Sequence, residues 1–240
     1  MSDYSIVINA GSIVLLPPEL ERQQRLDVLE SVLFAQMVAA KKYPGFQQAI
    51  LRYDAYREVL KNGWLQRAAA WKEFTPAAAS FNVPAWLCAQ LSEHVEQAAI
   101  DKVTRALKDV AQLSCTLPGI KLLCETACQQ GTPASPSVGA ETVYKVCMQI
   151  IFVQPGPTLS SVYVAFETTE HITANPLAQV FASDRVVGNI RLRYFKANLS
   201  AALYEPVRLA ITRKLGDKAS TNIIDISHIA QGDGEGAVCS

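Results

Sequence analysis

The sequence predicts a protein of the α/β (α+β) class, in which amphipathic helices cover an antiparallel sheet. Three observations lead to this prediction. Residues 143–154 carry apolar side chains at every second position, as in a strand whose two faces differ. Residues 161–169 and 186–197 repeat this alternation. The chain before residue 130 has apolar residues at helical spacing instead, so its helices can cover the apolar face of the sheet.

The apolar face of the predicted sheet comes mainly from two strands that are close in the sequence. A Pro-Gly-Pro turn at residues 155–157 joins them, which predicts that they pair as a hairpin. Lys145, Cys147 and Gln149 belong to the opposite, mixed face of the first strand. The apolar side chains are Tyr144, Val146, Met148, Ile150 and Phe152 in the first strand and Val162, Val164 and Phe166 in the second.

The first 130 residues predict two short strands followed by helices. The strands are expected at residues 4–9 and 13–16, which are rich in Ile and Val. Asn82 is a good helix cap, and Leu91, Val95, Ala98 and Leu107 form the apolar stripe of the longest helix, which would extend about 45 Å. The predicted helices cover residues 19–42, 44–61, 64–74, 82–113 and 118–129.

The C-terminal half predicts mixed elements and a tail. We expect a short helix at residues 176–182, a helix that starts near Pro206 and stops at Gly216, and a final strand at residues 222–229. Residues 131–139 have the composition of a loop. The apolar faces of the helices before residue 130 and of the strands after it have nothing to pack on except each other. We therefore predict a single globular domain over residues 1–230 and a disordered, glycine-rich tail over residues 231–240.

Composition narrows the functional class. Half of the 240 residues are hydrophobic, which is enough for a sizeable core. Twenty-two basic residues balance twenty-two acidic ones, so no net charge attracts nucleic acid, and we predict no nucleic-acid partner. The start of the chain has no basic segment followed by an apolar run. We therefore expect a protein that is made as a soluble cytoplasmic chain without a signal peptide.

The cysteines and histidines show no spacing typical of a metal or catalytic site. Cys124 and Cys128 are four residues apart, with no second Cys or His pair at zinc-finger spacing. We interpret the cysteines as buried free thiols, except Cys239, which lies in the tail and is expected to be exposed. Three scattered histidines form no triad, and no nucleophile elbow or phosphate loop is present. We predict no catalytic residues, no metal and no enzyme activity, although an unrecognised active site stays an alternative.

Cys147 is the one cysteine on a predicted strand, and it has two interpretations. It can be a buried structural thiol. Its neighbours Val146 and Met148 can also form an apolar pocket for an acyl chain, which makes Cys147 a candidate for acyl attachment or lipid binding. No cofactor is predicted beyond this fatty acyl chain.

The order of elements resembles that of the Cyt-type cytolysins, which are bacterial crystal toxins with volvatoxin-like relatives in fungi. The similar pieces are VEQAAIDKVTRALKDV, within residues 94–113, and the strand sequences YKVCMQIIFV and SVYVAF. The Evf virulence factor, an antiparallel sheet with helices and a fatty-acylated cysteine, is a second resemblance. No cysteine of this chain can be matched to that of Evf.

The resemblance implies a three-layer α-β-α fold and a cytolytic toxin or virulence factor that is soluble and rearranges on lipid bilayers. It also implies lipid membranes as partners, possible self-association into oligomers, and release toward target-cell membranes. The eight apolar side chains of the hairpin are the expected membrane-interacting residues, because a membrane-spanning strand needs about 9 to 11 residues with one apolar face. Alternatives are a non-enzymatic protein-interaction or acyl-chain-binding virulence protein. A strand that helices cover permanently would also explain the alternation.

Overall fold

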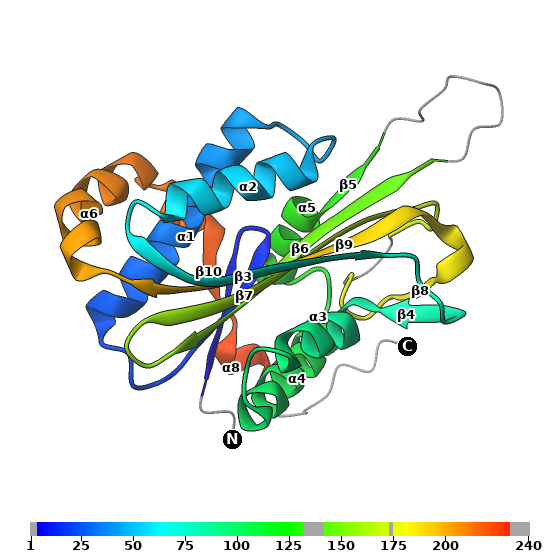
Figure 1. Ribbon diagram of the computed structural model, residues 1–240, viewed down its shortest axis with the longest axis horizontal. Helices are drawn as coiled ribbons and strands as arrows, with labels where there is room; N and C mark the ends of the chain where they lie inside the picture. The colour runs from blue at the N-terminus through cyan, green and yellow to red at the C-terminus, as the bar shows by residue number, and fades with distance from the viewer. Residues whose placement is uncertain (1–3, 132–141, 173–174, 231–240) are drawn as a thin grey trace.

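The computed structural model describes residues 4–131, 142–172 and 175–230. Within these ranges one large sheet lies between two layers of helices (Figure 1). The predicted three-layer α/β (α+β) fold with a mainly antiparallel sheet is therefore confirmed. The predicted single domain stays a prediction. The glycine-rich tail with Cys239, and nearly all of the loop predicted at residues 131–139, lie outside the described residues.

Eight strands form the large sheet: β1 (Ser5–Asn9), β2 (Ser12–Leu16), β3 (Trp64–Phe74), β5 (Cys128–Gln130), β6 (Tyr144–Gln154), β7 (Thr158–Thr168), β9 (Val186–Leu199) and β10 (Ile223–Asp225). Their order is β10-β1-β2-β6-β7-β9-β3, and β5 is a further partner of β6. β2 and β6 run parallel, and the other pairs described in this sheet are antiparallel. The hairpin of β6 and β7 therefore occupies the centre of the sheet.

The helices divide between the two faces of this sheet. They are α1 (Arg22–Lys42), α2 (Ala49–Leu60), α3 (Val83–Ser92), α4 (Gln97–Gln112), α5 (Pro118–Ala127), α6 (Ala201–Leu215), α7 (Lys218–Asn222) and α8 (Ser227–Ala230). Figure 1 shows α1 and α2 on one face and α3 and α4 on the other. Each face has its own buried apolar cluster, one under α1 and α2 and one under α3, α4 and α5.

Local sequence signals set several boundaries as predicted. The side chain of Asn82 caps α3 by accepting a hydrogen bond from the backbone N–H of Ala85 at 2.8 Å. α6 ends at Leu215 and is followed by Gly216, whose φ of +48° lies in the left-handed region that glycine adopts without strain. The predicted start of α6 is wrong, because the helix begins at Ala201 and Pro206 lies inside it.

Residues 64–74 form a strand, so the helix predicted there is wrong. The segment is rich in alanine, which favours a helix in isolation. In the folded chain it forms β3, which pairs with β9 from Trp64 opposite Leu199 to Phe74 opposite Ile190. A long pairing surface on β9 was available, so tertiary pairing overrode local propensity.

The long helix predicted over residues 82–113 is two helices. α3 ends at Ser92 and α4 begins at Gln97. In the turn between them, the ring of His94 stacks on Tyr194 of β9, with 3.8 Å between the ring centroids. Ala98, which we placed on the buried stripe, is exposed, because the helical phase restarts after the turn.

Two C-terminal predictions are also corrected. Residues 176–178 form a turn and not a helix, and they lead into β8 (Val180–Ala182), which pairs with β4 (Ser80–Asn82) in a second, two-stranded sheet. A 3-10 turn, η1 (Ser183–Arg185), then leads into β9. The final strand β10 has three residues and is followed by α8, so the strand predicted over residues 222–229 was too long.

Candidate functional site

The hairpin of β6 and β7 pairs without interruption along its whole length. The register runs from Tyr144 opposite Thr168 to Gln154 opposite Thr158, and each strand has eleven residues. Gly156 in the connecting turn has φ of +75°, which suits glycine. Because successive side chains point to opposite faces, the register also fixes which residues share a face.

One face of the hairpin is apolar over most of its length. Val146 lies opposite Phe166, Met148 opposite Val164, and Ile150 opposite Val162, and all six side chains are buried. Phe152 is buried on the same face. Tyr144 is half-buried at the far end, where its ring meets that of His171 edge-on at 5.1 Å. The eight side chains predicted from the sequence therefore lie on one face, and their contact with a membrane stays a prediction.

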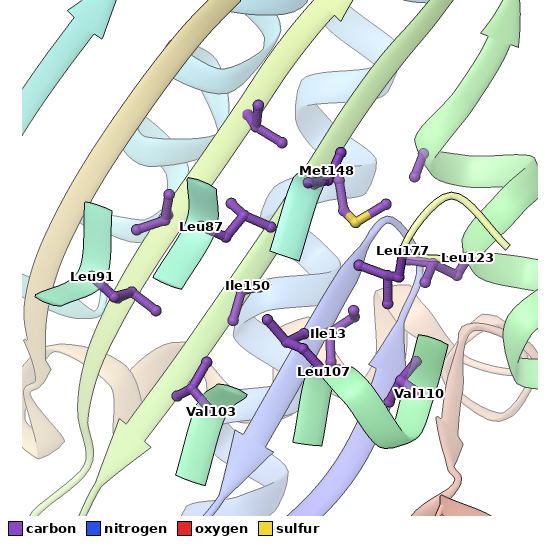
Figure 2. Packing of buried hydrophobic residues seen from close by; sticks show 14 of the residues in the cluster. Ile13, Leu87, Leu91, Val103, Leu107, Val110, Leu123, Met148, Ile150 and Leu177 are labelled. Carbon is purple, nitrogen blue, oxygen red and sulfur yellow. The ribbon is translucent and has the colours of Figure 1, made fainter. Parts of the chain in front are cut away.

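Helices α3, α4 and α5 cover this apolar face. In Figure 2, Met148 and Ile150 lie among side chains from these three helices and from β2. Of the sequence stripe, Leu91 and Leu107 are fully buried and Val95 packs at the margin. We call α3 and α4 together with their turn the cover. The labelled residues of the cover are Leu87, Leu91, Val103, Leu107 and Val110.

The opposite face of the hairpin is also largely buried, and it combines polar groups with Ile151, Val153 and Leu159 nearer the turn. Lys145 and Glu167 lie directly opposite each other, with 2.7 Å between the Lys145 Nζ and a Glu167 carboxylate oxygen. Lys145 also donates to the side-chain oxygen of Gln47 at 3.2 Å. A direct cross-strand pair of opposite charges stabilises the hairpin in this register.

A hydrogen-bonded chain of three side chains crosses the middle of this polar face. The Ser12 hydroxyl donates to Gln149 Oε1 at 3.0 Å, and Gln149 Nε2 donates to the Ser161 hydroxyl at 2.6 Å. All three residues are buried between the sheet and the helices α1 and α2. A buried hydrogen bond contributes only about 0.5 to 1.5 kcal/mol net, so apolar residues of similar shape can serve a permanently covered sheet nearly as well.

Three tyrosines lie beside this chain of hydrogen bonds. Tyr53 stacks on Tyr163 with 4.6 Å between ring centroids, and Tyr56 lies next to Tyr53. Burial raises the pKa of each tyrosine. The hydroxyls of Tyr53 and Tyr56 are buried, and they lie near the side chains of Ser161 and Gln149, respectively. Sequence reasoning missed this cluster, because it joins two residues of α2 to one of β7, far away in the chain.

Cys147 lies on the polar face, so its predicted apolar pocket is wrong in detail. Val146 and Met148 point to the opposite face of the strand. Cys147 instead borders two cavities, one of about 50 Å³ whose walls include Arg52 and Gln149, and one of about 240 Å³ whose walls include Lys145 and Glu167. Burial raises the pKa of the Cys147 thiol to about 11, so it is protonated at neutral pH. Acylation of Cys147 stays a prediction, as does an acyl cofactor.

Apart from Cys147, the described residues offer few candidates for a reactive thiol or a metal site. The described cysteines are free, but only Cys147 is fully buried, and Cys115 is exposed. Cys88, Cys124 and Cys128 are half-buried, so the expectation of buried thiols is correct only in part. Within residues 4–131, 142–172 and 175–230, no group of three His, Cys, Asp or Glu side chains is placed to hold a metal ion. The helices in these ranges include none with the length and apolar composition to cross a bilayer.

Comparison with known proteins finds similarity only among solved structures. No family model matches the chain, and a search of curated proteins finds no match. A delta-endotoxin structure has 9% identity and a TM-score of 0.46, covering 82% of this chain and 86% of the endotoxin. The activated Cyt2Ba monomer from Bacillus thuringiensis subsp. israelensis has 10% identity and a TM-score of 0.43, covering 80% and 98%. The Evf virulence factor has 9% identity and a TM-score of 0.34, covering 90% and 82%.

The TM-scores compare only the arrangement of the backbone. The structures include the two groups whose resemblance the sequence indicated, but at 9–10% identity and TM-scores below 0.5 they bring no activity to this chain. A functional assignment has to rest on the two faces of the hairpin and on what covers them.

Proposed function

We propose that this protein is a membrane-active toxin or virulence factor whose β6–β7 hairpin moves from the protein core into a lipid bilayer. The observation that carries the proposal is the difference between the two buried faces of the hairpin. One is apolar along most of its length. The other holds an ion pair and the hydrogen-bonded side chains of Ser12, Gln149 and Ser161, and becomes apolar only toward the turn, at Ile151, Val153 and Leu159. Such a hairpin can face lipid on one side and water on the other.

The dimensions of the hairpin suit this role. A tilted strand crosses the hydrocarbon core of a bilayer with about 9 to 11 residues, and β6 and β7 have eleven residues each. Lys145 and Glu167 lie near the open end of the hairpin, where one of the interfaces would be. The side chains between that end and the turn include no charged residue on the apolar face.

The cover is built so that it can separate from the sheet as one piece. On the C-terminal side of the cover residues 113–117 are irregular, and on its N-terminal side β4, which pairs with β8, lies between the cover and the irregular residues 75–79. Asn175 also donates a hydrogen bond of 2.7 Å to the carbonyl of Val110 in α4. Apolar contacts hold it to the sheet, together with an ion pair between Lys72 and Glu93 and the stacking of His94 on Tyr194. Apolar contacts to the sheet can be exchanged for contacts to lipid chains at little cost, since both are apolar surroundings.

The backbone of an inserted hairpin requires further partners. The backbone groups of β6 and β7 hydrogen-bond to each other along the edge that the two strands share. Along their outer edges, these strands pair with β2, β5 and β9. Unpaired backbone groups cost several kcal/mol each in lipid, so an inserted hairpin has to pair with strands of other copies. Self-association on the membrane is therefore part of the proposal.

Dye-loaded liposomes of several lipid compositions test the proposal, with leakage and co-sedimentation as readouts. Spin labels placed one at a time along residues 158–168 test the geometry. In the bound state, labels at Val162, Val164 and Phe166 should be accessible to oxygen, which concentrates in lipid, and labels at Ser161, Tyr163 and Ala165 to a water-soluble relaxation agent. The absence of leakage and of binding under all conditions, including mild acid and proteolytic nicking, would exclude membrane activity. If dye leaks but the accessibility of the labels does not alternate from one residue to the next, the hairpin is not the part of the protein that enters the membrane.

A further inference from the structure

Residues 175–182 reach the cover from a distant part of the sequence, and we call them the strap. The strap includes the turn at residues 176–178 and β8. β8 pairs with β4, which directly precedes α3 in the chain. In Figure 1, the small sheet of β4 and β8 lies beside α3 and apart from the large sheet. The strap therefore packs with the cover although β5, β6 and β7 separate the two in the sequence.

Asn175 ties one end of the strap to the end of α4. Its side chain is buried, and its Nδ2 donates hydrogen bonds to the carbonyls of Val110 at 2.7 Å and of Leu113 at 3.4 Å. Its Oδ1 accepts from the backbone N–H of Leu177 at 3.1 Å. The last carbonyls of a helix have no partners within the helix, so this amide supplies partners to the end of α4. Leu177 itself belongs to the same buried cluster as Leu107 and Val110, as Figure 2 shows.

The other end of the strap is tied to α3 through β4. β4 and β8 pair over three residues each, and the backbone N–H of Ser183 donates to the carbonyl of Ala79 at 2.9 Å. Phe181 lies opposite Phe81, and both are buried. The ring of Phe81 stacks on Trp86 of α3, with 3.6 Å between the ring centroids. Backbone pairing and stacked rings thus connect β8 with the first turn of α3.

Two further hydrogen bonds join the strap to residues that follow β7. The carboxylate of Glu170 accepts from the backbone N–H of Ala182 at 2.9 Å, and the side chain of Gln179 donates to the carbonyl of His171 at 3.3 Å. Glu170 and His171 lie beyond the end of β7 and belong to no strand of the large sheet. These bonds therefore anchor the strap to irregular chain and not to the sheet.

The strap meets the large sheet itself through apolar side chains. The ring of Phe181 lies edge-on to Phe166 of β7, with 5.1 Å between the ring centroids. Leu177 packs in the cluster that also contains Met148 and Ile150 of β6. The same cluster holds α3 and α4 on this face of the sheet. The strap and the cover are thus attached to the hairpin in the same way.

We propose that the strap, β4 and the cover form one cooperative unit, which opens away from the large sheet with the pairing of β4 and β8 intact. Within this unit, backbone hydrogen bonds and the buried amide of Asn175 join the parts, so separating them would leave buried polar groups without partners. Between the unit and the sheet, the contacts are mainly apolar. Native proteins open partially in cooperative units of this kind. The inference concerns the protein in solution and does not rest on the proposed membrane activity.

Native-state hydrogen exchange of the full chain in low concentrations of denaturant tests the unit. The amide hydrogens of Leu107 in α4, Leu177 in the strap and Ser183 after β8 should exchange through one opening, with the same dependence on denaturant. The amides in the centre of β6 and β7 should stay protected during this opening. The proposal would be overturned if the strap opened independently of α4, or if α4 opened only together with β6 and β7.

A substitution at Asn175 tests the connection between the strap and α4. Asn175→Ala removes the bonds to Val110 and Leu113. It should accelerate exchange in α4 and in the strap by the same factor, roughly ten- to hundredfold, the range for buried groups that lose a partner. Gln112→Ala, at an exposed position of α4, should leave both rates unchanged. Acceleration in the strap alone would contradict the proposal.

A disulfide between β4 and β8 gives a test that does not involve Asn175. Ser80 lies opposite Ala182, so Ser80→Cys and Ala182→Cys can be joined in a chain that lacks its other cysteines. If the unit opens as a whole, exchange in α4 should be the same in the oxidised and the reduced protein. Much slower exchange in α4 after oxidation would overturn the proposal, because the opening of the cover would then require β4 to part from β8.

Discussion

Gln149 is a buried amide at the centre of the sheet, with 4% of its surface exposed. Its two hydrogen bonds reach Ser12 on β2 and Ser161 on β7, so it links three strands on one face. In a protein whose hairpin never leaves the core, apolar residues of similar volume would serve equally well at these three positions. In a hairpin that inserts into lipid, they would form part of the water-facing side.

Substitutions at Ser12, Gln149 and Ser161 distinguish the contribution of these residues to stability from their contribution to activity. Gln149→Leu alone should lower the free energy of unfolding by about 1 to 3 kcal/mol, because two buried serine hydroxyls lose their partner. The triple variant Ser12→Ala, Gln149→Leu, Ser161→Ala should be as stable as the wild type or more stable, and yet release less dye from liposomes. Urea unfolding and leakage assays measure the two effects. Wild-type leakage by the triple variant would mean that this face does not meet water.

Cys147 reports on the opening of the same face. In a variant that keeps only this cysteine, alkylation of the folded protein by iodoacetamide should accelerate with pH until about pH 11, because burial raises the pKa of the thiol to about 11 from its usual 9.0. In urea the rate should level off near pH 9. Liposome-bound protein should react faster than free protein at pH 8. A plateau near pH 9 in the folded protein would contradict the burial of this thiol.

At the scale of elements, the sequence predicted the strands of the hairpin better than their surroundings. Alternation fixed the faces of β6 and β7 because the period of a strand is two residues. It did not reveal that α1 and α2 lie over the polar face too, since alternation gives the direction of side chains and not what packs against them. β3 was missed because Ala-rich residues 64–74 have helical propensity and only pairing with β9 makes them a strand.

The break between the two helices of the cover is a second feature that the sequence did not predict. The apolar period of residues 82–113 continues through the turn between α3 and α4, so the sequence shows no break there. The stacking of His94 on Tyr194 accompanies that break, and this contact joins residues far apart in the chain. The candidate site was thus predictable for the apolar residues of the hairpin, and not for Tyr53, Tyr56 or the path of the cover.

Two aspartate substitutions in α4 test how the cover packs. Leu107→Asp should lower the free energy of unfolding by at least about 3 kcal/mol, because it places an unpaired charge in the buried cluster. Ala98→Asp, at an exposed position of the same helix, should change it by less than about 0.5 kcal/mol. Denaturant unfolding compares the two variants. Equal effects would contradict the orientation of α4 on the sheet.

At the scale of the whole molecule, three layers hold the hairpin in the centre of a sheet, with helices over both of its faces. A protein built in this way cannot present its apolar strand face to lipid unless the cover leaves. Separation of α3 and α4 from the sheet is therefore the step on which the proposed activity depends. The irregular residues 75–79 and 113–117 allow it without breaking the hairpin, provided that the pairing of β4 with β8 opens or moves with the cover.

Locking the cover onto the sheet tests this step directly. Lys72 on β3 and Glu93 at the end of α3 form an exposed ion pair, so cysteines at these positions can be joined by a reducible bifunctional thiol reagent in a chain that lacks its other cysteines. The matched control joins α3 to α4 only. Thr104→Cys places a second thiol at the position where the Thr104 hydroxyl now lies 3.3 Å from the Cys88 sulfur.

The decisive measurement is dye release from liposomes by the two cross-linked proteins before and after reduction. With Lys72→Cys joined to Glu93→Cys, we expect no release, and reduction should restore the wild-type rate. The control, in which the cover is intact but free to leave the sheet, should release dye in both states. Full release by the protein whose cover is locked to the sheet would contradict the account, because the apolar face of the hairpin would then stay covered during activity.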